Sequence, residues 1–94
     1  MENKEKNYAL VTVATSGIGY ELVKLLAKDG YNLIITARGE EGLQKVSDEL
    51  TSTFNVDVVT ISKDLFKREA AFELYEEIRS KGLKVFYVQF HILS

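Results

Sequence analysis

The sequence predicts an α/β fold: a four-stranded parallel sheet in the order 3-2-1-4, joined by three crossover helices. Short apolar runs rich in β-branched residues alternate with stretches of helical periodicity, which gives the order βαβαβαβ. Strands separated by helices are parallel, and right-handed crossovers fix their order. The chain contains no proline and no low-complexity segment that would mark a linker. We therefore expect a solvated polar tail over residues 1–7 and one domain over residues 8–94.

The first crossover unit begins with an apolar run at residues 8–13 (YALVTV), which predicts a strand, followed by a glycine-containing loop at 14–19 (ATSGIG). A helix follows and continues to Asp29, and Gly30 is placed as its C-terminal stop. Apolar residues recur along it at helical spacing, namely Ile18, Leu22, Leu25 and Leu26. Residues 32–37 (NLIITA) then predict the second strand.

The same alternation continues, with strands predicted at residues 56–61 and 83–93. The second helix carries one apolar stripe, made of Leu43, Val46 and Leu50. The third helix ends before Gly82, and its stripe is Ala71, Leu74, Tyr75 and Ile78. In the order 3-2-1-4 the first two helices cover one face of the sheet, and the third stands alone on the other.

Composition excludes several kinds of site and partner. The net charge is -2 and the basic residues do not cluster, which argues against a nucleic-acid partner. There is no cysteine and the lone histidine, His91, lies in an apolar strand, so we expect no metal and assign His91 to packing or an interface. No run approaches about 18 apolar residues, and the polar start is unlike a signal peptide. We expect no membrane partner and a cytoplasmic location.

Three segments resemble the N-terminal half of a short-chain dehydrogenase/reductase: residues 9–19 (ALVTVATSGIG), Ala37-Arg38 after strand 2, and residues 63–65 (KDL) after strand 3. The resemblance extends from residue 8 to about residue 85. It implies a partial Rossmann fold that stops before the family's catalytic residues. The catalytic Ser, Tyr and Lys of the family follow strands 5 and 6, beyond Ser94.

The glycine-containing loop predicts a phosphate site, because a helix start offers free backbone N–H groups and the positive end of the helix dipole. Gly17 and Gly19, with Ser16 and Ile18 between and beside them, would form it. The alternative is that the glycines only permit close packing of strand and helix. The family pattern is Thr-Gly-x-x-x-Gly-x-Gly, and Val13 stands where its first glycine belongs. We therefore expect NADP affinity to be weak or lost.

Arg38 indicates which nicotinamide cofactor the resemblance implies. A cation at the end of strand 2 accommodates the 2′-phosphate of NADP, whereas an acidic residue there would bind the ribose of NAD. A solvated surface arginine is the alternative. The resemblance places Asp64 and Leu65 beside the adenine ring, and Asp64 could also be the N-cap of the third helix.

Departures from the family gather at the carboxyl ends of the strands. The family's Asn-Asn-Ala-Gly segment after strand 4 is replaced at residues 90–93 (FHIL), and Phe66 replaces a small polar residue. Tyr20 and Lys24 match the family's Tyr-x-x-x-Lys spacing but belong to the first helix, where we expect them to share one flank.

Three hypotheses for function follow. The first is a non-catalytic, self-associating fragment with at most residual NADP(H) binding. The second is an NADP-dependent oxidoreductase whose catalytic half comes from another chain or a longer product. The third is an interaction module that uses the edge of strand 4.

Strand 4 predicts self-association, because it is an apolar edge with no Lys or Pro after Lys84 to block pairing. We expect a homodimer in which strand 4 of two copies pairs antiparallel about a two-fold axis, or in which the two copies exchange their C-terminal segments. The pairing would use Val85, Tyr87, Phe90 and Ile92. Phe72 and Tyr75 of the third helix would adjoin that interface.

Overall fold

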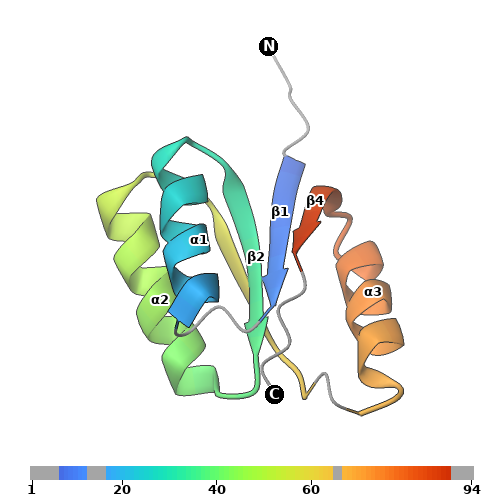
Figure 1. Ribbon diagram of the computed structural model, residues 1–94. Helices are drawn as coiled ribbons and strands as arrows, with labels where there is room; N and C mark the ends of the chain where they lie inside the picture. Colours follow the sequence, from blue (N-terminus) through green and yellow to red (C-terminus); the bar gives the residue numbers. More distant parts are fainter. Residues whose placement is uncertain (1–6, 13–16, 65–66, 90–94) are drawn as a thin grey trace.

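The computed structural model describes residues 7–12, 17–64 and 67–89 of the 94-residue chain. The strands and helices alternate as the sequence predicts (Figure 1). They are β1 (Asn7–Thr12), α1 (Gly17–Lys28), β2 (Asn32–Ala37), α2 (Glu40–Thr53), β3 (Val58–Ser62), α3 (Ala70–Ser80) and β4 (Lys84–Gln89). All the strands pair in parallel in the order β3-β2-β1-β4, which confirms the predicted sheet. The predicted tail, apart from Asn7, and His91 lie outside the described residues.

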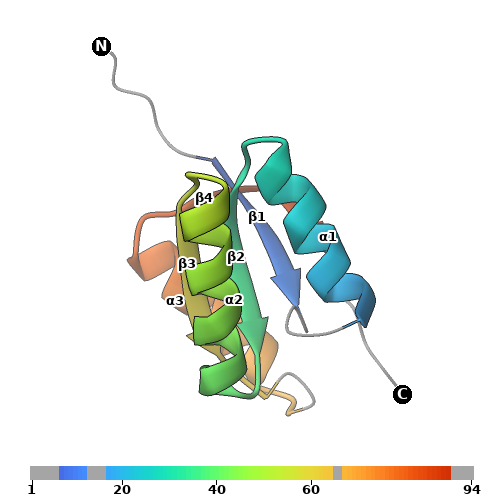
Figure 2. The ribbon, with the colours of Figure 1, turned by 90° about the vertical axis from the view of Figure 1, so that its left-hand side faces the viewer.

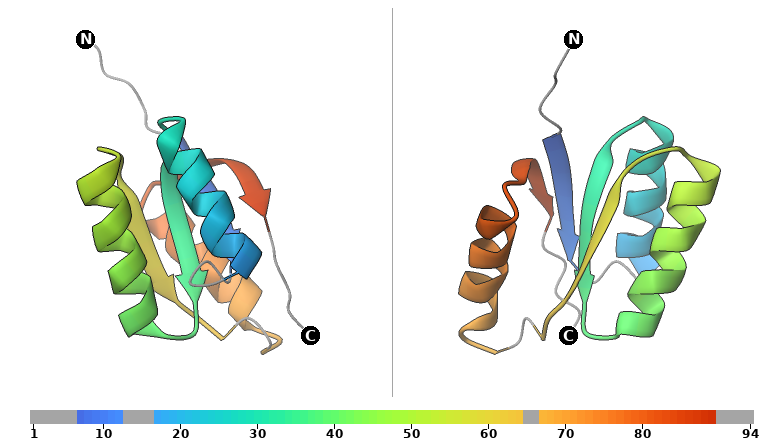
Figure 3. Two further views of the ribbon diagram at one scale, coloured as in Figure 1. Left: turned by 60° about the vertical axis from the view of Figure 1, so that its left-hand side comes forward. Right: turned by 180° about the vertical axis from the view of Figure 1, so that it is seen from behind.

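Helices cover the two faces of the sheet unequally. Figure 2 shows α1 and α2 in front of the sheet and α3 behind it, and Figure 3 shows the same layers from two other sides. Successive side chains of a strand point to opposite faces of the sheet, so the strands contribute residues to two separate cores. The core under α1 and α2 contains Ala9, Val11, Val23, Ala27, Leu33, Ile35, Ala37, Leu43, Val46 and Leu50. The core under α3 contains Tyr8, Leu10, Ile34, Ile61, Leu74 and Ile78.

The helix stripes are partly corrected by the structure. The prediction for α2 is confirmed, but Leu25 of α1 is 61% exposed, and Val23 is fully buried in its place. At 3.6 residues per turn, Leu25 lies about 200° round the helix from Val23, so the two cannot face the same core. In α3 the buried line begins at Ala70, and Tyr75 is 60% exposed. The apolar stripes expected along α1 and α3 therefore do not coincide with their buried sides, because Leu25 and Ala71 are exposed, whereas the exposure of Tyr75 agrees with its predicted place beside the interface.

Glycine ends both α1 and α3, as predicted. Gly30 has a φ of 93° and Gly82 a φ of 72°, in the left-handed region that glycine adopts without steric cost. At the end of α1, the N–H of Gly30 bonds to the carbonyl of Ala27 at 2.9 Å, and the N–H of Tyr31 bonds to Leu26 at 3.0 Å. These two bonds satisfy the last carbonyls of the helix in the Schellman arrangement. The end of α3 repeats the pattern at Gly82 and Leu83.

Candidate functional site

The predicted site residues follow the carboxyl ends of β1, β2 and β3, which lie at the lower edge of the sheet in Figure 1. Gly17 begins α1, Arg38 comes directly after β2, and Asp64 comes two residues after β3. Because parallel strands end at one edge, the fold gathers these three segments there. Ser16 and Leu65, together with Val13 and Phe66, lie outside the described residues.

The three helix starts at this edge differ in charge. α2 begins with Glu40 and Glu41, and α3 has Glu73 in its first turn. The first turn of α1 contains no acidic residue, so no carboxylate of its own offsets the positive end of its dipole. This is the helix start to which the glycines were assigned as a phosphate site. Gly19 is also buried, which fits the packing interpretation equally well.

Arg38 is an exposed residue at a bend between β2 and α2. Its backbone is bonded to the end of β3: the Ser62 hydroxyl donates to the carbonyl of Arg38 at 2.8 Å. One residue earlier, the carbonyl of Ala37 accepts the N–H of Lys63 at 2.9 Å. The bend that carries Arg38 is thus attached to the neighbouring strand at two consecutive carbonyls.

Lys63 is a second cation at this edge, and it forms ion pairs with two glutamates of α3. Its ammonium nitrogen lies 3.5 Å from a carboxylate oxygen of Glu73 and 3.6 Å from one of Glu77. The Lys63 side chain is only 23% exposed, whereas Glu73 is 58% exposed. These ion pairs connect the end of β3 to α3.

Asp64 is not the N-cap of α3, so that prediction was wrong. The helix begins at Ala70 and its N-cap position is Glu69. Two turns precede the helix: the carbonyl of Asp64 accepts the N–H of Lys67, and the carbonyl of Lys67 accepts the N–H of Ala70, each at 3.1 Å. These turns add residues between β3 and α3, which moves the helix start away from Asp64. The adenine contact of Asp64 stays a prediction.

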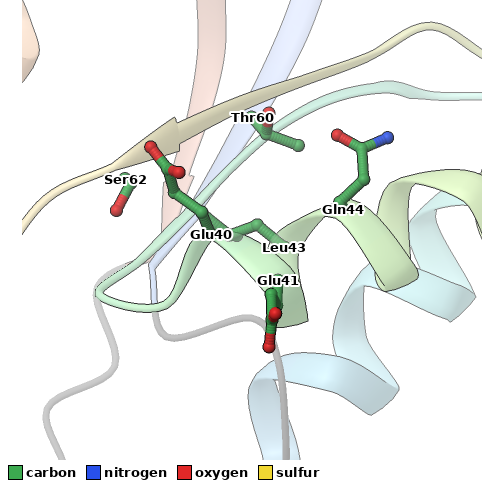
Figure 4. A pocket seen from close by; sticks show the side chains of 6 residues that line it. All are labelled: Glu40, Glu41, Leu43, Gln44, Thr60 and Ser62. Atoms are coloured by element: carbon green, nitrogen blue, oxygen red, sulfur yellow. The ribbon is translucent and has the colours of Figure 1, made fainter.

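A hollow of about 440 Å³ lies between α2 and the edge strand β3. Figure 4 shows Glu40 reaching toward β3, where Ser62 lies, while Glu41 points away from that strand. The lining residues are Glu40, Glu41, Leu43, Gln44, Thr60 and Ser62. Two carboxylates make this hollow unfavourable for a phosphate, in contrast to the start of α1. Sequence reasoning singled out none of its polar residues, although Glu40 and Glu41 follow Arg38 closely.

Tyr20 and Lys24 share one flank of α1, as predicted, and Tyr20 bonds to α2. The Tyr20 hydroxyl donates to the carboxylate of Glu49, with distances of 2.7 and 2.8 Å to its two oxygens. The ammonium nitrogen of Lys24 lies 5.0 Å from the centre of the Tyr20 ring. The hydrogen bond to Glu49, followed by burial and the charge of Glu49, raises the pKa of Tyr20 above 10.0. A tyrosine that acts as a general base needs the opposite shift.

Metal and membrane sites were not expected. Across residues 7–12, 17–64 and 67–89, no three His, Cys, Asp or Glu side chains are grouped so that they could hold a metal ion. None of the helices in this described part of the chain is long and apolar enough to span a membrane.

Comparison with known proteins finds relatives among dehydrogenases and reductases. The family model for short chain dehydrogenases matches residues 7–88. The very-long-chain 3-oxoacyl-CoA reductase of Anas platyrhynchos is 36% identical over 80 residues, which are 83% of this chain and 25% of that enzyme. The chain therefore spans about a quarter of the length of this curated relative.

Two solved structures superpose well on the chain. The alcohol dehydrogenase of the archaeon Thermococcus sibiricus, complexed with 5-hydroxy-NADP, gives a TM-score of 0.80 at 30% identity, covering 90% of this chain and 36% of that one. The L-sorbose reductase of Gluconobacter frateurii, complexed with NADPH and L-sorbose, gives 0.74 at 28% identity, covering 81% and 29%. These two proteins were solved with NADP-type cofactors.

Proposed function

Because this chain belongs to the short-chain dehydrogenase family, we propose that the edge formed by β1, β2 and β3 binds NADP(H). The observation that carries the proposal is the position of Arg38 directly after β2, at the same sheet edge as a helix start without acidic residues. A guanidinium pairs with a phosphate through two parallel hydrogen bonds, which suits the 2′-phosphate that distinguishes NADP from NAD. The cofactors in two similar solved structures support this choice.

Each predicted residue receives one role. Backbone N–H groups of the segment Ser16, Gly17, Ile18 and Gly19 bind the pyrophosphate. Arg38 binds the 2′-phosphate. Asp64 and Leu65 line the adenine ring. Val13 weakens the affinity, since a β-branched side chain adds bulk where the pyrophosphate passes.

We propose further that these 94 residues bind the cofactor without catalysing hydride transfer to a substrate. Reduction of a carbonyl needs a proton donor beside the nicotinamide. Tyr20 has the family's spacing to Lys24, but its hydroxyl is bonded to Glu49 and its pKa is shifted upward. The second candidate is an oxidoreductase whose catalytic groups come from another chain or a longer product. The span of about a quarter of a curated relative favours that candidate.

Calorimetric titration of NADPH and NADH into the chain tests the cofactor proposal. We expect tighter binding of NADPH, stronger binding of both cofactors after Val13→Gly, and loss of the NADPH preference after Arg38→Gln. Lys63→Gln is the matched control. It also removes a cation from this edge of the sheet, but that cation is paired with Glu73 and Glu77. Absence of binding by both the wild type and Val13→Gly would reject the proposal. Family-like catalytic sequence downstream in the gene would favour the second candidate.

Self-association through β4 is a further function that one observation favours. In the sheet that the structure describes, β4 is an end strand that pairs with β1 alone. Beside it lies an apolar groove of about 420 Å³, lined by Leu10, Ala71, Leu74, Tyr75, Ile78, Arg79, Leu83 and Val85. Phe72, which is 66% exposed, lies on the helix that forms one wall of this groove. A second copy of the chain pairing antiparallel along β4 would continue the sheet and approach the groove.

We assign this dimer contact to Val85, Tyr87, Phe90 and Ile92, of which the last two lie outside the described residues. Size-exclusion chromatography with light scattering is the test, and a dimer at micromolar concentration is the expected result. Tyr87→Lys should give a monomer. Thr60→Lys, on the opposite edge strand β3, is the control and should leave the dimer intact. A stable monomer of the wild type would refute the dimer.

A further inference from the structure

The hydrogen bonds around Arg38 show that the chain turns at this residue. Successive carbonyls of a strand point to alternate sides, so a continuing strand would direct the carbonyl of Arg38 away from the partner bonded by Ala37. Instead, Ala37 accepts the N–H of Lys63 at 2.9 Å and Arg38 accepts the hydroxyl of Ser62 at 2.8 Å. Two consecutive carbonyls are thus bonded by consecutive residues at the end of β3.

This turn determines how the chain enters α2. Gly39 follows in an extended conformation, with φ of -93° and ψ of 119°, and Glu40 begins the helix. The carbonyl of Gly39 already accepts a helical bond from Leu43 at 3.2 Å. Arg38 and Gly39 therefore form a two-residue link between β2 and α2, and Ser62 bonds to the backbone of that link from the side.

We propose that Ser62 is the positioning residue for Arg38, and that its hydroxyl makes the chain select cofactors with a 2′-phosphate. The inference rests on the proposed NADP(H) site. A two-pronged guanidinium–phosphate contact depends on direction as well as charge, so its strength depends on where the Arg38 backbone is held. Fixing that backbone before the ligand arrives lowers the entropy lost on binding. Ser62 acts through Arg38 and needs no contact with the cofactor.

Neighbouring residues show why this role belongs to Ser62. Ser62 and Ala37 are opposite each other in the pairing of β2 with β3, so the Ser62 side chain lies beside Arg38, the residue that follows Ala37. Thr60 faces the same hollow two residues earlier, farther from the bend (Figure 4). Lys63 contributes its backbone N–H to the bend but directs its ammonium to Glu73 and Glu77 of α3. Ser62 thus supplies a side-chain bond to the backbone of the bend.

The experiment is a calorimetric comparison of NADPH and NADH binding to the wild type, Ser62→Ala and Ser62→Thr. Ser62→Ala should weaken NADPH binding about fivefold, the size of one net hydrogen bond, and leave NADH binding unchanged. Ser62→Thr keeps the hydroxyl and should restore the NADPH preference. Ser80→Ala is the matched control, because Ser80 makes the same kind of exposed bond, to the carbonyl of Glu77 at 3.1 Å, at the far end of α3. It should change neither affinity.

The outcomes separate this inference from the proposed function. Equal weakening of NADPH and NADH by Ser62→Ala would indicate a purely structural role and overturn the positioning role alone. An unchanged preference for NADPH in Ser62→Ala would do the same. If Arg38→Gln loses the preference for NADPH while Ser62→Ala gives either of these results, the proposed cofactor site is still supported. Failure of the wild type and of Val13→Gly to bind either cofactor would overturn both proposals.

Discussion

The two faces of the sheet are built differently, although one set of strands supplies both. Under α1 and α2 the central residues Leu33, Ile35 and Leu50 are all 0% exposed. On the α3 side a single helix covers the sheet, an apolar groove stays open, and Phe72 and Tyr75 are 66% and 60% exposed. Stability is therefore concentrated in the doubly covered face, and the singly covered face has apolar surface to offer a partner.

The strand residues buried on the two faces also differ in polarity. Those under α1 and α2 are entirely apolar, namely Ala9, Val11, Leu33, Ile35 and Ala37. By the alternation of side chains, the α3 face receives Thr12 and Thr36, which are 1% and 0% exposed and lie opposite each other in β1 and β2. The α3 face thus contains buried hydroxyls, each of which must form a hydrogen bond.

The largest expected effect comes from truncating one leucine in each core. Leu50 of α2 and Leu74 of α3 are both buried, at 0% and 2% exposure, and each is a leucine that belongs to the core between its helix and the sheet. We expect Leu50→Ala to lower the free energy of unfolding by about 4 kcal/mol, and Leu74→Ala by about 2 to 3 kcal/mol. The cavity left by Leu50 would be closed, because Leu50 is fully buried and does not line the hollow beside α2, whereas the cavity left by Leu74 opens toward the groove that Leu74 lines and can collapse.

Urea unfolding of both variants, followed by circular dichroism, measures this difference. Equal losses would mean that the α3 face is packed as firmly as the other. A larger loss for Leu74→Ala would reverse the comparison, and would indicate that a second copy closes the groove in solution.

Thr36→Val tests the buried polar side of the α3 face. The Thr36 hydroxyl donates to the carbonyl of Ile61 on β3, and valine keeps the shape while removing that donor. We expect a loss of about 1 to 2 kcal/mol, because the carbonyl of Ile61 loses a partner in a buried place. Thr51→Val is the control: Thr51 is an exposed residue of α2, and its hydroxyl donates to the carbonyl of Ser47 at 2.9 Å, in a part-buried position that water can reach from the Thr51 side. Equal changes in the two variants, measured by urea unfolding, would argue against the buried bond.

The variants Gly30→Ala and Gly82→Ala test whether the conformational cost of a non-glycine residue differs between the two faces. Gly30 ends α1 on one face, and Gly82 ends α3 on the other. Both glycines have positive φ, and an added Cβ would meet no atom within 4 Å at either position. The cost is therefore conformational alone, and we expect about 1 kcal/mol for each variant. Thermal unfolding should give similar decreases in Tm for the two. A marked inequality would show that the end of α1 or of α3 is free to change its conformation.

Sequence periodicity was sufficient for the sheet order and for the helix ends, because alternation of element types and glycine at helix stops are local signals. It was insufficient for the buried side of α1, where Leu25 was chosen and Val23 is buried. The three leucines of α1 share an arc of about 100°, and the buried side that contains Val23 and Ala27 lies next to that arc, so the leucine spacing alone does not identify the side that meets the sheet. Asp64 was misassigned as an N-cap because the two turns before Ala70 leave no periodic pattern.

The site divides in the same way. Segments after strands could be placed at one edge from topology alone, and Arg38 was selected because it follows β2 directly, while its role toward a cofactor stays a prediction. The bond from Ser62 to Arg38 joins residues that are 24 apart and depends on the register of β2 with β3. A one-residue change of register would turn the Ser62 side chain to the other face. Register is set by the whole core, so no short motif could have indicated Ser62.

The smallest expected effect concerns the outer surface of the doubly covered face, where Tyr20 bonds to Glu49 and joins α1 to α2. Because the bond raises the pKa of Tyr20 above 10.0, the neutral phenol is favoured in the folded protein. The contribution of this bond to stability is then fully present below pH 10, and it is lost as the pH rises through the pKa that Tyr20 has in the folded protein. Spectrophotometric titration of the wild type minus Tyr20→Phe isolates this one tyrosine. Glu49→Gln should move the pKa of Tyr20 back toward its ordinary value. An unchanged titration in Glu49→Gln would mean that the two helices are not joined there, and that the closed face depends on its core alone.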